Sequence, residues 1–155
     1  MAGVRVLVDT DVLIDYLNAG DHGAFLEHPR SRIYYSVVTR KELLAKKGLH
    51  AAERDAILDT LRHFRVVRLD RAVTDRYSAL RREYPRLEKE DALIAATALA
   101  KRLPLMTGNW RHFSGIADLT LFVGAARPEN PGGAPATRPR KKGRARSRTA
   151  TSRAI

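Results

Sequence analysis

The chain alternates short apolar runs with longer stretches whose apolar residues recur at helical spacing. Five apolar runs bounded by polar residues predict buried parallel strands, at residues 4–8, 33–38, 66–69, 105–107 and 119–123. Helical spacing follows at residues 12–18, from about 39, at 51–64, at 71–84 and from about 90 to 102. This alternation predicts an α/β fold, a three-layer α/β/α sandwich with a mainly parallel central sheet.

The composition changes at Gly124. Residues 124–155 are rich in Pro, Gly, Ala, Thr and Arg, and carry nine Lys or Arg against one Glu, which accounts for +8 of the formal net charge of +12. Such a segment has little apolar surface to offset its ordering entropy. We expect one domain over residues 1–123 and a disordered basic tail over 124–155. The tail is either a silent solubilising extension or an electrostatic arm for RNA.

Several classes of protein are excluded by what the chain lacks. It has no cysteine, so it can form neither a disulfide framework nor a Cys-ligated zinc site, and its five His are not spaced as zinc ligands. The run at the N-terminus is too short for a signal peptide, and no apolar stretch approaches the ~20 residues of a membrane span. We expect a cytoplasmic protein without a membrane partner.

Three acids stand at junctions between predicted elements. Asp9 ends the first strand, where open parallel sheets bind ligands, although Asp9 or Thr10 could simply cap the next helix. Glu42 follows Thr39 by three residues, which also fits a capping box. Asp91 heads a helix that is apolar almost all round, where a carboxylate needs a partner, either the helix terminus or a shared cation.

Further polar residues lie near the same predicted edge. Asp11 and Asp15 share a helix face, either solvated or steering a metal towards Asp9. Asn109 follows the strand at 105–107 in a Gly-Asn turn and offers a neutral oxygen. If the first strand is central, the acids converge, and their repulsion calls for a divalent cation; hard oxygen ligands suit Mg²⁺ or Mn²⁺.

Four segments in register resemble the PIN-domain ribonucleases, specifically the VapC-type toxins of VapBC toxin-antitoxin systems. They are VLVDTDVLIDYL at 6–17, SVVTRKEL at 36–43, DALIAATA at 91–98 and LPLMTGNWRHF at 103–113. The resemblance covers nearly all of residues 4–123 and none of the tail. It implies the PIN fold and an endoribonuclease that hydrolyses RNA phosphodiester bonds with Mg²⁺ or Mn²⁺.

The resemblance also assigns roles to residues. Asp9, Glu42 and Asp91 match the metal-binding catalytic acids, and Asn109 stands where a fourth polar residue completes the site, supported by Thr107. The family often has another acid shortly after this position, where the present chain has His112. As partners the resemblance implies an RNA substrate, a cognate antitoxin protein and a second copy of the chain in a homodimer.

Two other functions compete. The segment Asp9–Val12 also fits the nucleophile loop of a haloacid-dehalogenase-like phosphatase, which would need a well-placed Lys and a later pair of acids, of which only Asp91 is found. Alternatively, the chain is a non-catalytic RNA-binding module in which the acids are helix caps and the tail binds RNA. Arg81, Arg82 and Arg111 could set RNA specificity or could be solvated charges.

Overall fold

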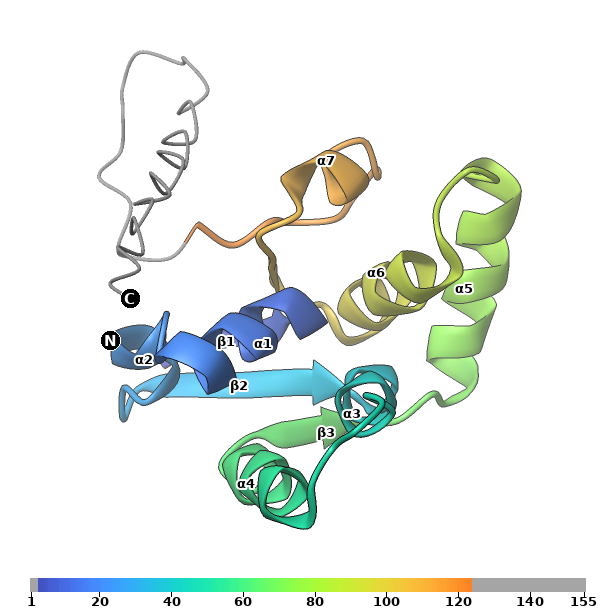
Figure 1. Cartoon of the computed structure of the whole chain (residues 1–155). Helices are drawn as coiled ribbons and strands as arrows, with labels where there is room; N and C mark the ends of the chain where they lie inside the picture. The colour runs from blue at the N-terminus through green and yellow to red at the C-terminus, as the bar shows by residue number, and fades with distance from the viewer. Residues whose placement is uncertain (1–2, 124–155) are drawn as a thin grey trace, which may run out of the picture.

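A computed structural model of the protein describes residues 3–123 (Figure 1). It forms a central sheet with helices on both faces, as the alternation of apolar runs predicts. The tail predicted for residues 124–155 lies outside the described residues. Within residues 3–123, none of the helices is both long and apolar enough to cross a bilayer.

The sheet has four parallel strands in the order β3-β2-β1-β4. The strands are β1 (Val4–Val8), β2 (Ser31–Ser36), β3 (Arg65–Val67) and β4 (Leu105–Met106). The chain moves outward from β1 through β2 to β3 and then returns to the other side of β1 with β4. Strand order therefore reverses between β1 and β4, the place where open α/β sheets form a crevice at the carboxyl ends of their strands.

Two hydrophobic cores, one on each face of the sheet, hold the layers together. On one face, Leu7 and Leu105 pack against α5, α6 and α7; on the other, Val6 and Val8 pack against α1 to α4. Side chains of successive strand residues point to opposite faces, so one apolar run supplies both cores. The helices are α1 (Thr10–Ala19), α2 (Gly23–Leu26), α3 (Val37–Leu44), α4 (Ala51–Leu61), α5 (Arg71–Glu83), α6 (Lys89–Lys101) and α7 (Trp110–Phe113).

Helix α6 is the most buried helix, as its composition predicts. Six of its residues are buried: Ala92, Ile94, Ala95, Ala96, Thr97 and Ala98. The hydroxyl of Thr97 donates to the carbonyl oxygen of Leu93 at 2.7 Å, which satisfies a polar group inside the helix. Small alanines allow α6 to lie close to both the sheet and α5, with which it packs side by side (Figure 1).

Several predicted elements differ in extent from the structure, for example the third strand, which spans Arg65–Val67 and not 66–69. The second strand ends at Ser36 instead of residue 38, because the Ser36 side chain accepts the Val38 N–H at 3.1 Å and starts α3 at Val37. The predicted strand at 119–123 is reduced to a single bridge between Leu105 and Leu121. Among residues 3–123 it pairs with β4, which is two residues long, so there is little edge for a fifth strand to pair with.

Candidate functional site

Asp9 lies at the centre of the crevice, directly after β1. Its side chain is only 7% exposed, and both carboxylate oxygens accept hydrogen bonds. Oδ1 accepts the N–H of Thr10 at 2.8 Å, and Oδ2 accepts the hydroxyl of Thr107 at 2.9 Å. Asp9 is thus the N-cap of α1, one of the two roles that its position in the sequence allows, but it is also held across the crevice by the residue that follows β4.

The raised pKa of the Asp9 carboxyl indicates a site in which a cation would be favourable. The pKa of its carboxyl is raised from 3.8 to about 6, first by burial and then by the nearby charge of Asp11, while the bonds from Thr107 and Thr10 oppose the rise. The charge of Asp91 adds to the increase, although the two residues are 82 positions apart in the chain. Asp9 and Asp91 therefore lie close enough to repel each other through the crevice.

Asp91 lies in the first turn of α6, but its side chain does not cap that helix. The N-cap residue is Glu88, and no side-chain hydrogen bond caps the helix there. The Oδ2 atom of Asp91 lies 2.7 Å from Nδ1 of His112 in α7. His112 is thus one partner of the Asp91 carboxylate. In the sequence, His112 was notable only because the family often has an acid near this position.

His112 Nδ1 is also 2.7 Å from the amide of Asn109, where Nδ2 is placed. An ionised carboxylate only accepts hydrogen bonds, so the contact with Asp91 requires a proton on Nδ1. A protonated Nδ1 is a donor, so its partner on Asn109 must be the amide oxygen and not the N–H₂ group. Rotating the amide by a half-turn exchanges these two groups and places the oxygen next to Nδ1. In that orientation Asn109 directs a neutral oxygen to the side of the crevice where Asp91 lies.

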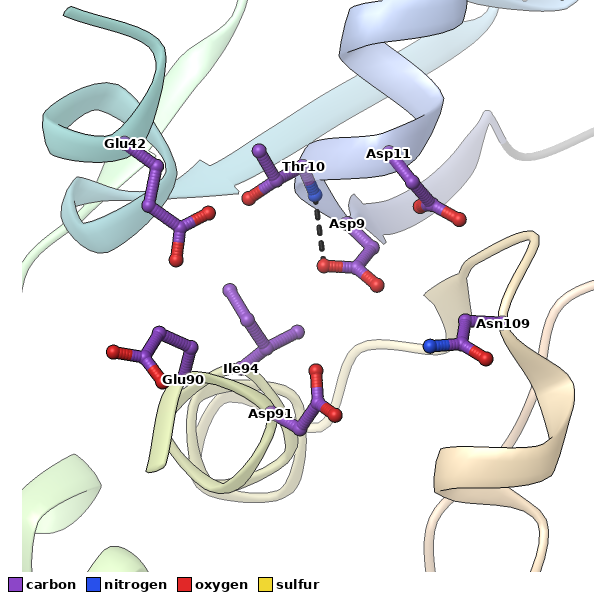
Figure 2. Close-up of a pocket in the computed structure, with 8 residues that line it drawn as sticks. All are labelled: Asp9, Thr10, Asp11, Glu42, Glu90, Asp91, Ile94 and Asn109. Carbon is purple, nitrogen blue, oxygen red and sulfur yellow. Dashed lines mark hydrogen bonds between the residues drawn. The ribbon is translucent and has the colours of Figure 1, made fainter. Parts of the chain in front are cut away.

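Glu42 is not a helix cap. Because α3 begins at Val37, Thr39 is inside the helix and its buried hydroxyl lies 2.9 Å from the hydroxyl of Thr10. The proposed capping box between Thr39 and Glu42 is therefore absent. Glu42 is half-buried and directs its carboxylate toward the cavity that Asp9 and Asp91 also line (Figure 2). Nothing in the local helix geometry explains this placement.

These residues line one open cavity of about 200 Å³ (Figure 2). All four residues predicted for the site take part, together with four others. The lining consists of Asp9, Thr10, Asp11, Glu42, Glu90, Asp91, Ile94 and Asn109. Five of these eight residues carry carboxylates and none is Lys or Arg. Glu90 was not predicted from the sequence, where its only signal was its place next to Asp91 in the first turn of α6.

Asp11 and Asp15 differ in their relation to the cavity. Asp11 lines it, accepts the N–H of Gly108 at 2.9 Å through Oδ2, and has a pKa raised by burial. A Cβ on Gly108 would lie 2.8 Å from the same Asp11 oxygen, so a larger residue there would force the Asp11 carboxylate to move. Asp15 is exposed and outside the lining; its charge adds to the raised pKa of Asp11.

The donor chemistry of the cavity fits Mg²⁺ or Mn²⁺, which prefer carboxylate and amide oxygens. In the rotamers described, no three Asp, Glu or His side chains of residues 3–123 are close enough to hold one ion. One oxygen each of Asp11 and Asp91 is instead bonded to the N–H of Gly108 and to Nδ1 of His112. The backbone nevertheless brings five carboxylates to the lining of one cavity.

Comparison with known proteins agrees with this geometry. Residues 6–119 match the sequence profile of the PIN domain, a span that includes every residue of the cavity lining. The chain belongs to the PIN domain family. The family resemblance inferred from the four sequence segments is thereby confirmed, and so is the three-layer α/β/α fold.

Individual relatives include a curated protein and several solved structures. Ribonuclease VapC1 of Methanocaldococcus jannaschii is 28% identical over 124 residues, which cover 77% of this chain and 86% of that protein. A toxin-antitoxin complex from Klebsiella pneumoniae contains a chain that is 30% identical, with a TM-score of 0.62 over 74% of this chain and 95% of that one. VapBC2 from Rickettsia felis, bound to a promoter DNA fragment, has a similar fold. The TM-score is 0.65 and the identity 20%, over 77% of this chain and 98% of that one.

Proposed function

We propose that this PIN domain protein is a metal-dependent endoribonuclease and the toxin of a type II toxin-antitoxin pair. The observation that carries the proposal is the buried Asp9 at the carboxyl end of β1, facing Asp91 and Glu42 across one acidic cavity. Buried like charges are costly to maintain, so they are kept where a cation offsets them. The names of Ribonuclease VapC1 and of the toxin-antitoxin complex support the substrate and the class.

Each residue has a definite task in this hypothesis. Asp9 and Asp91 would bind a divalent cation directly, Glu42 would hold it through water, and Asn109 would add a neutral oxygen. When bound, the cation would offset negative charge on the scissile phosphate and lower the pKa of the attacking water. The Thr107 hydroxyl fixes Asp9, and His112 fixes Asp91, so two of the acids are oriented before any substrate arrives.

The two competing functions fit the site less well. A haloacid-dehalogenase-like phosphatase needs a Lys near its nucleophile, and the cavity around Asp9 is lined by no Lys among the described residues. A non-catalytic RNA-binding module requires the acids to be ordinary caps. Glu42 and Asp91 cap no helix, and both face the cavity.

A proposed toxin needs partners. By analogy with the toxin-antitoxin complex from Klebsiella pneumoniae, we propose that a cognate antitoxin covers the acidic cavity. We also propose, from the family resemblance of the sequence, that two copies of the chain form a homodimer. A cationic side chain of the antitoxin would be complementary to a cavity with five carboxylates and no Lys or Arg in its lining.

Purified protein and a structured RNA test the activity directly. We expect cleavage with Mn²⁺ or Mg²⁺, none with EDTA, and loss of cleavage in Asp9→Asn and in Asp91→Asn. Sequencing of RNA 5′ ends after brief induction of wild type and Asp9→Asn then identifies the cut site. Full activity in EDTA, or in both variants, would show that the acidic cavity does not cleave RNA.

A further inference from the structure

Three arginines surround one tyrosine on the sheet face that carries Leu7. Arg5 on β1 is in register with Arg32 on β2, and Tyr34, two positions further along β2, is in register with Arg65 on β3. Residues in register on paired strands point to the same face, and so do residues two apart on one strand. Arg5, Arg32, Tyr34 and Arg65 therefore form one group, called here the Arg–Tyr patch.

The patch is ordered around the tyrosine ring. Tyr34 is partly buried and packs against the core formed by Leu7 and helices α5 and α6. The guanidinium carbon of Arg5 lies 5.4 Å from the centre of the Tyr34 ring, within the range of a cation–π contact. The pKa of the Tyr34 hydroxyl is lowered, chiefly by the Arg5 side chain and then by the charges of Arg65 and Arg32.

The positive charge of the patch is not neutralised within the described chain. Arg5, Arg32 and Arg65 are all exposed, and none takes part in the salt bridges found among residues 3–123. The charged groups that act on Tyr34 are all arginines. Like charges on neighbouring strands are destabilising, and nothing in the packing of the sheet requires them at exposed positions.

We propose that the Arg–Tyr patch binds phosphate groups of RNA outside the cleavage site. Guanidinium groups bind phosphate oxygens in a two-pronged geometry, and Arg5 is already held in place by the tyrosine ring. Contacts to phosphate carry no sequence information, so they strengthen binding regardless of sequence. The inference rests on the proposed function and assigns a second contact to the same RNA.

The patch is separate from the acidic cavity. Arg5 precedes Asp9 by four positions on an extended strand, which places their Cα atoms ~13 Å apart. The cavity lining contains none of the four patch residues. A substrate with a single phosphodiester can occupy the cavity without reaching the patch, whereas a long RNA can reach both. Substrate length therefore separates the two contributions.

The test is RNA binding in EDTA, where cleavage does not interfere, by the full chain carrying Arg5→Gln, Arg32→Gln and Arg65→Gln. A matched control carries Arg54→Gln, Arg62→Gln and Arg71→Gln, which removes the same charge from exposed positions on or beside α4 and α5. Arg62 and Arg71 already face Asp59 and Asp75. The basic tail is the same in every variant, so differences come from the substituted positions.

Loss of three phosphate contacts to single-stranded RNA should lower the slope of log Kd against log salt by about 2 and weaken binding about tenfold or more. The control should retain most of the affinity. Equal weakening in both variants, or none in either, overturns the proposal, as does unchanged RNA binding accompanied by weaker binding of the antitoxin. Circular dichroism of both variants confirms that they fold.

Cleavage separates this proposal from the proposed function. With Mn²⁺, the patch variant should raise KM for a long RNA and leave hydrolysis of bis-p-nitrophenyl phosphate, a single phosphodiester, unchanged. If no variant, including wild type, cleaves either substrate, the proposed nuclease activity is wrong, while the binding result in EDTA still decides the role of the patch.

Discussion

Nδ1 of His112 lies 2.7 Å from Oδ2 of Asp91, so a residue of α7 fixes a carboxylate of α6 at the edge of the acidic cavity. The contact joins two helices through residues that lie 21 positions apart in the sequence. It leaves the other oxygen of Asp91 available to the cavity. In metal sites, side chains that orient a ligand in this way commonly matter nearly as much as the ligand itself.

Replacement of His112 by alanine should weaken metal binding and RNA cleavage by about 10- to 100-fold, because Asp91 loses the group that orients it. Calorimetric titration with Mn²⁺ measures the first effect and cleavage kinetics the second. His112→Gln, which retains a hydrogen-bond donor, should recover part of both. Arg111→Ala, at the exposed neighbouring position, is the control for Mn²⁺ affinity. Unchanged Mn²⁺ affinity in His112→Ala would show that the contact does not position Asp91.

The buried charge of Asp9 makes stability depend on pH. The pKa of its carboxyl is about 6 in the folded protein against the ordinary value of 3.8, so the folded protein holds this proton more tightly than the unfolded chain. The folded state therefore loses stability as the pH rises between these two values, by about 3 kcal/mol in total. Well above the folded-state pKa the whole penalty is present, and well below the ordinary value it is absent.

Asp9→Asn should accordingly stabilise the metal-free protein at pH 7.5 by roughly 2 kcal/mol, because the amide removes the charge and can still bond to Thr10 and Thr107. Urea unfolding in EDTA at pH 5 and pH 7.5 measures this, with a smaller gain expected at pH 5. With Mn²⁺ the order should reverse, since only the wild type binds the ion. A variant that is less stable than the wild type in EDTA at pH 7.5 would contradict the expected cost of the buried charge.

The position of Asp9 could be predicted because it depends on a simple pattern. An apolar run that ends in an acid places that acid at the carboxyl end of a strand, and the buried composition of α6 similarly revealed that Asp91 needs a partner. The contact with His112 could not be predicted, since it depends on how α7 packs on α6. Phe113, fully buried beside His112, determines that orientation, and no local pattern reports it.

The role of Glu42 was ambiguous in the sequence for a physical reason. Val37 and Val38 are β-branched and read as a continuation of the strand, which moved the expected helix start to Thr39 and made Glu42 a capping residue. The Ser36 side chain starts the helix two residues earlier. The side-chain hydrogen bond of Ser36 thus outweighed the local strand propensity. Because the helix starts two residues earlier, Glu42 is not a capping residue, and its carboxylate is free to serve the cavity.

This difference yields a paired test. Glu42→Gln should leave the free energy of unfolding within about 0.5 kcal/mol, since it breaks no cap, and should reduce cleavage about 10- to 100-fold if Glu42 holds the ion through water. Ser36→Ala, in contrast, should lower the free energy of unfolding by about 1 kcal/mol or more, because it removes a fully buried helix cap. Urea unfolding of the metal-free proteins compares them. Equal destabilisation by both substitutions would restore the capping role of Glu42.

Thr107 connects three parts of the site through one hydroxyl. It donates to Asp9 Oδ2 at 2.9 Å and accepts the N–H of Asn109 at 3.0 Å, and it is buried. Thr107→Val should lower stability by about 1–3 kcal/mol, because the amide of Asn109 and the carboxylate of Asp9 each lose a buried partner. The Thr107 bond also lowers the pKa of Asp9, so its loss should raise that pKa above about 6.

The acid limb of the cleavage rate against pH should therefore move to higher pH in Thr107→Val, because Asp9 must be ionised to act as a ligand. Thr107→Ser keeps the hydroxyl and should restore both the pH profile and most of the stability, which separates the hydrogen bond from the loss of the methyl group. If the valine variant is destabilised but keeps the wild-type pH profile, Thr107 supports the fold at this corner and has no influence on the charge of Asp9.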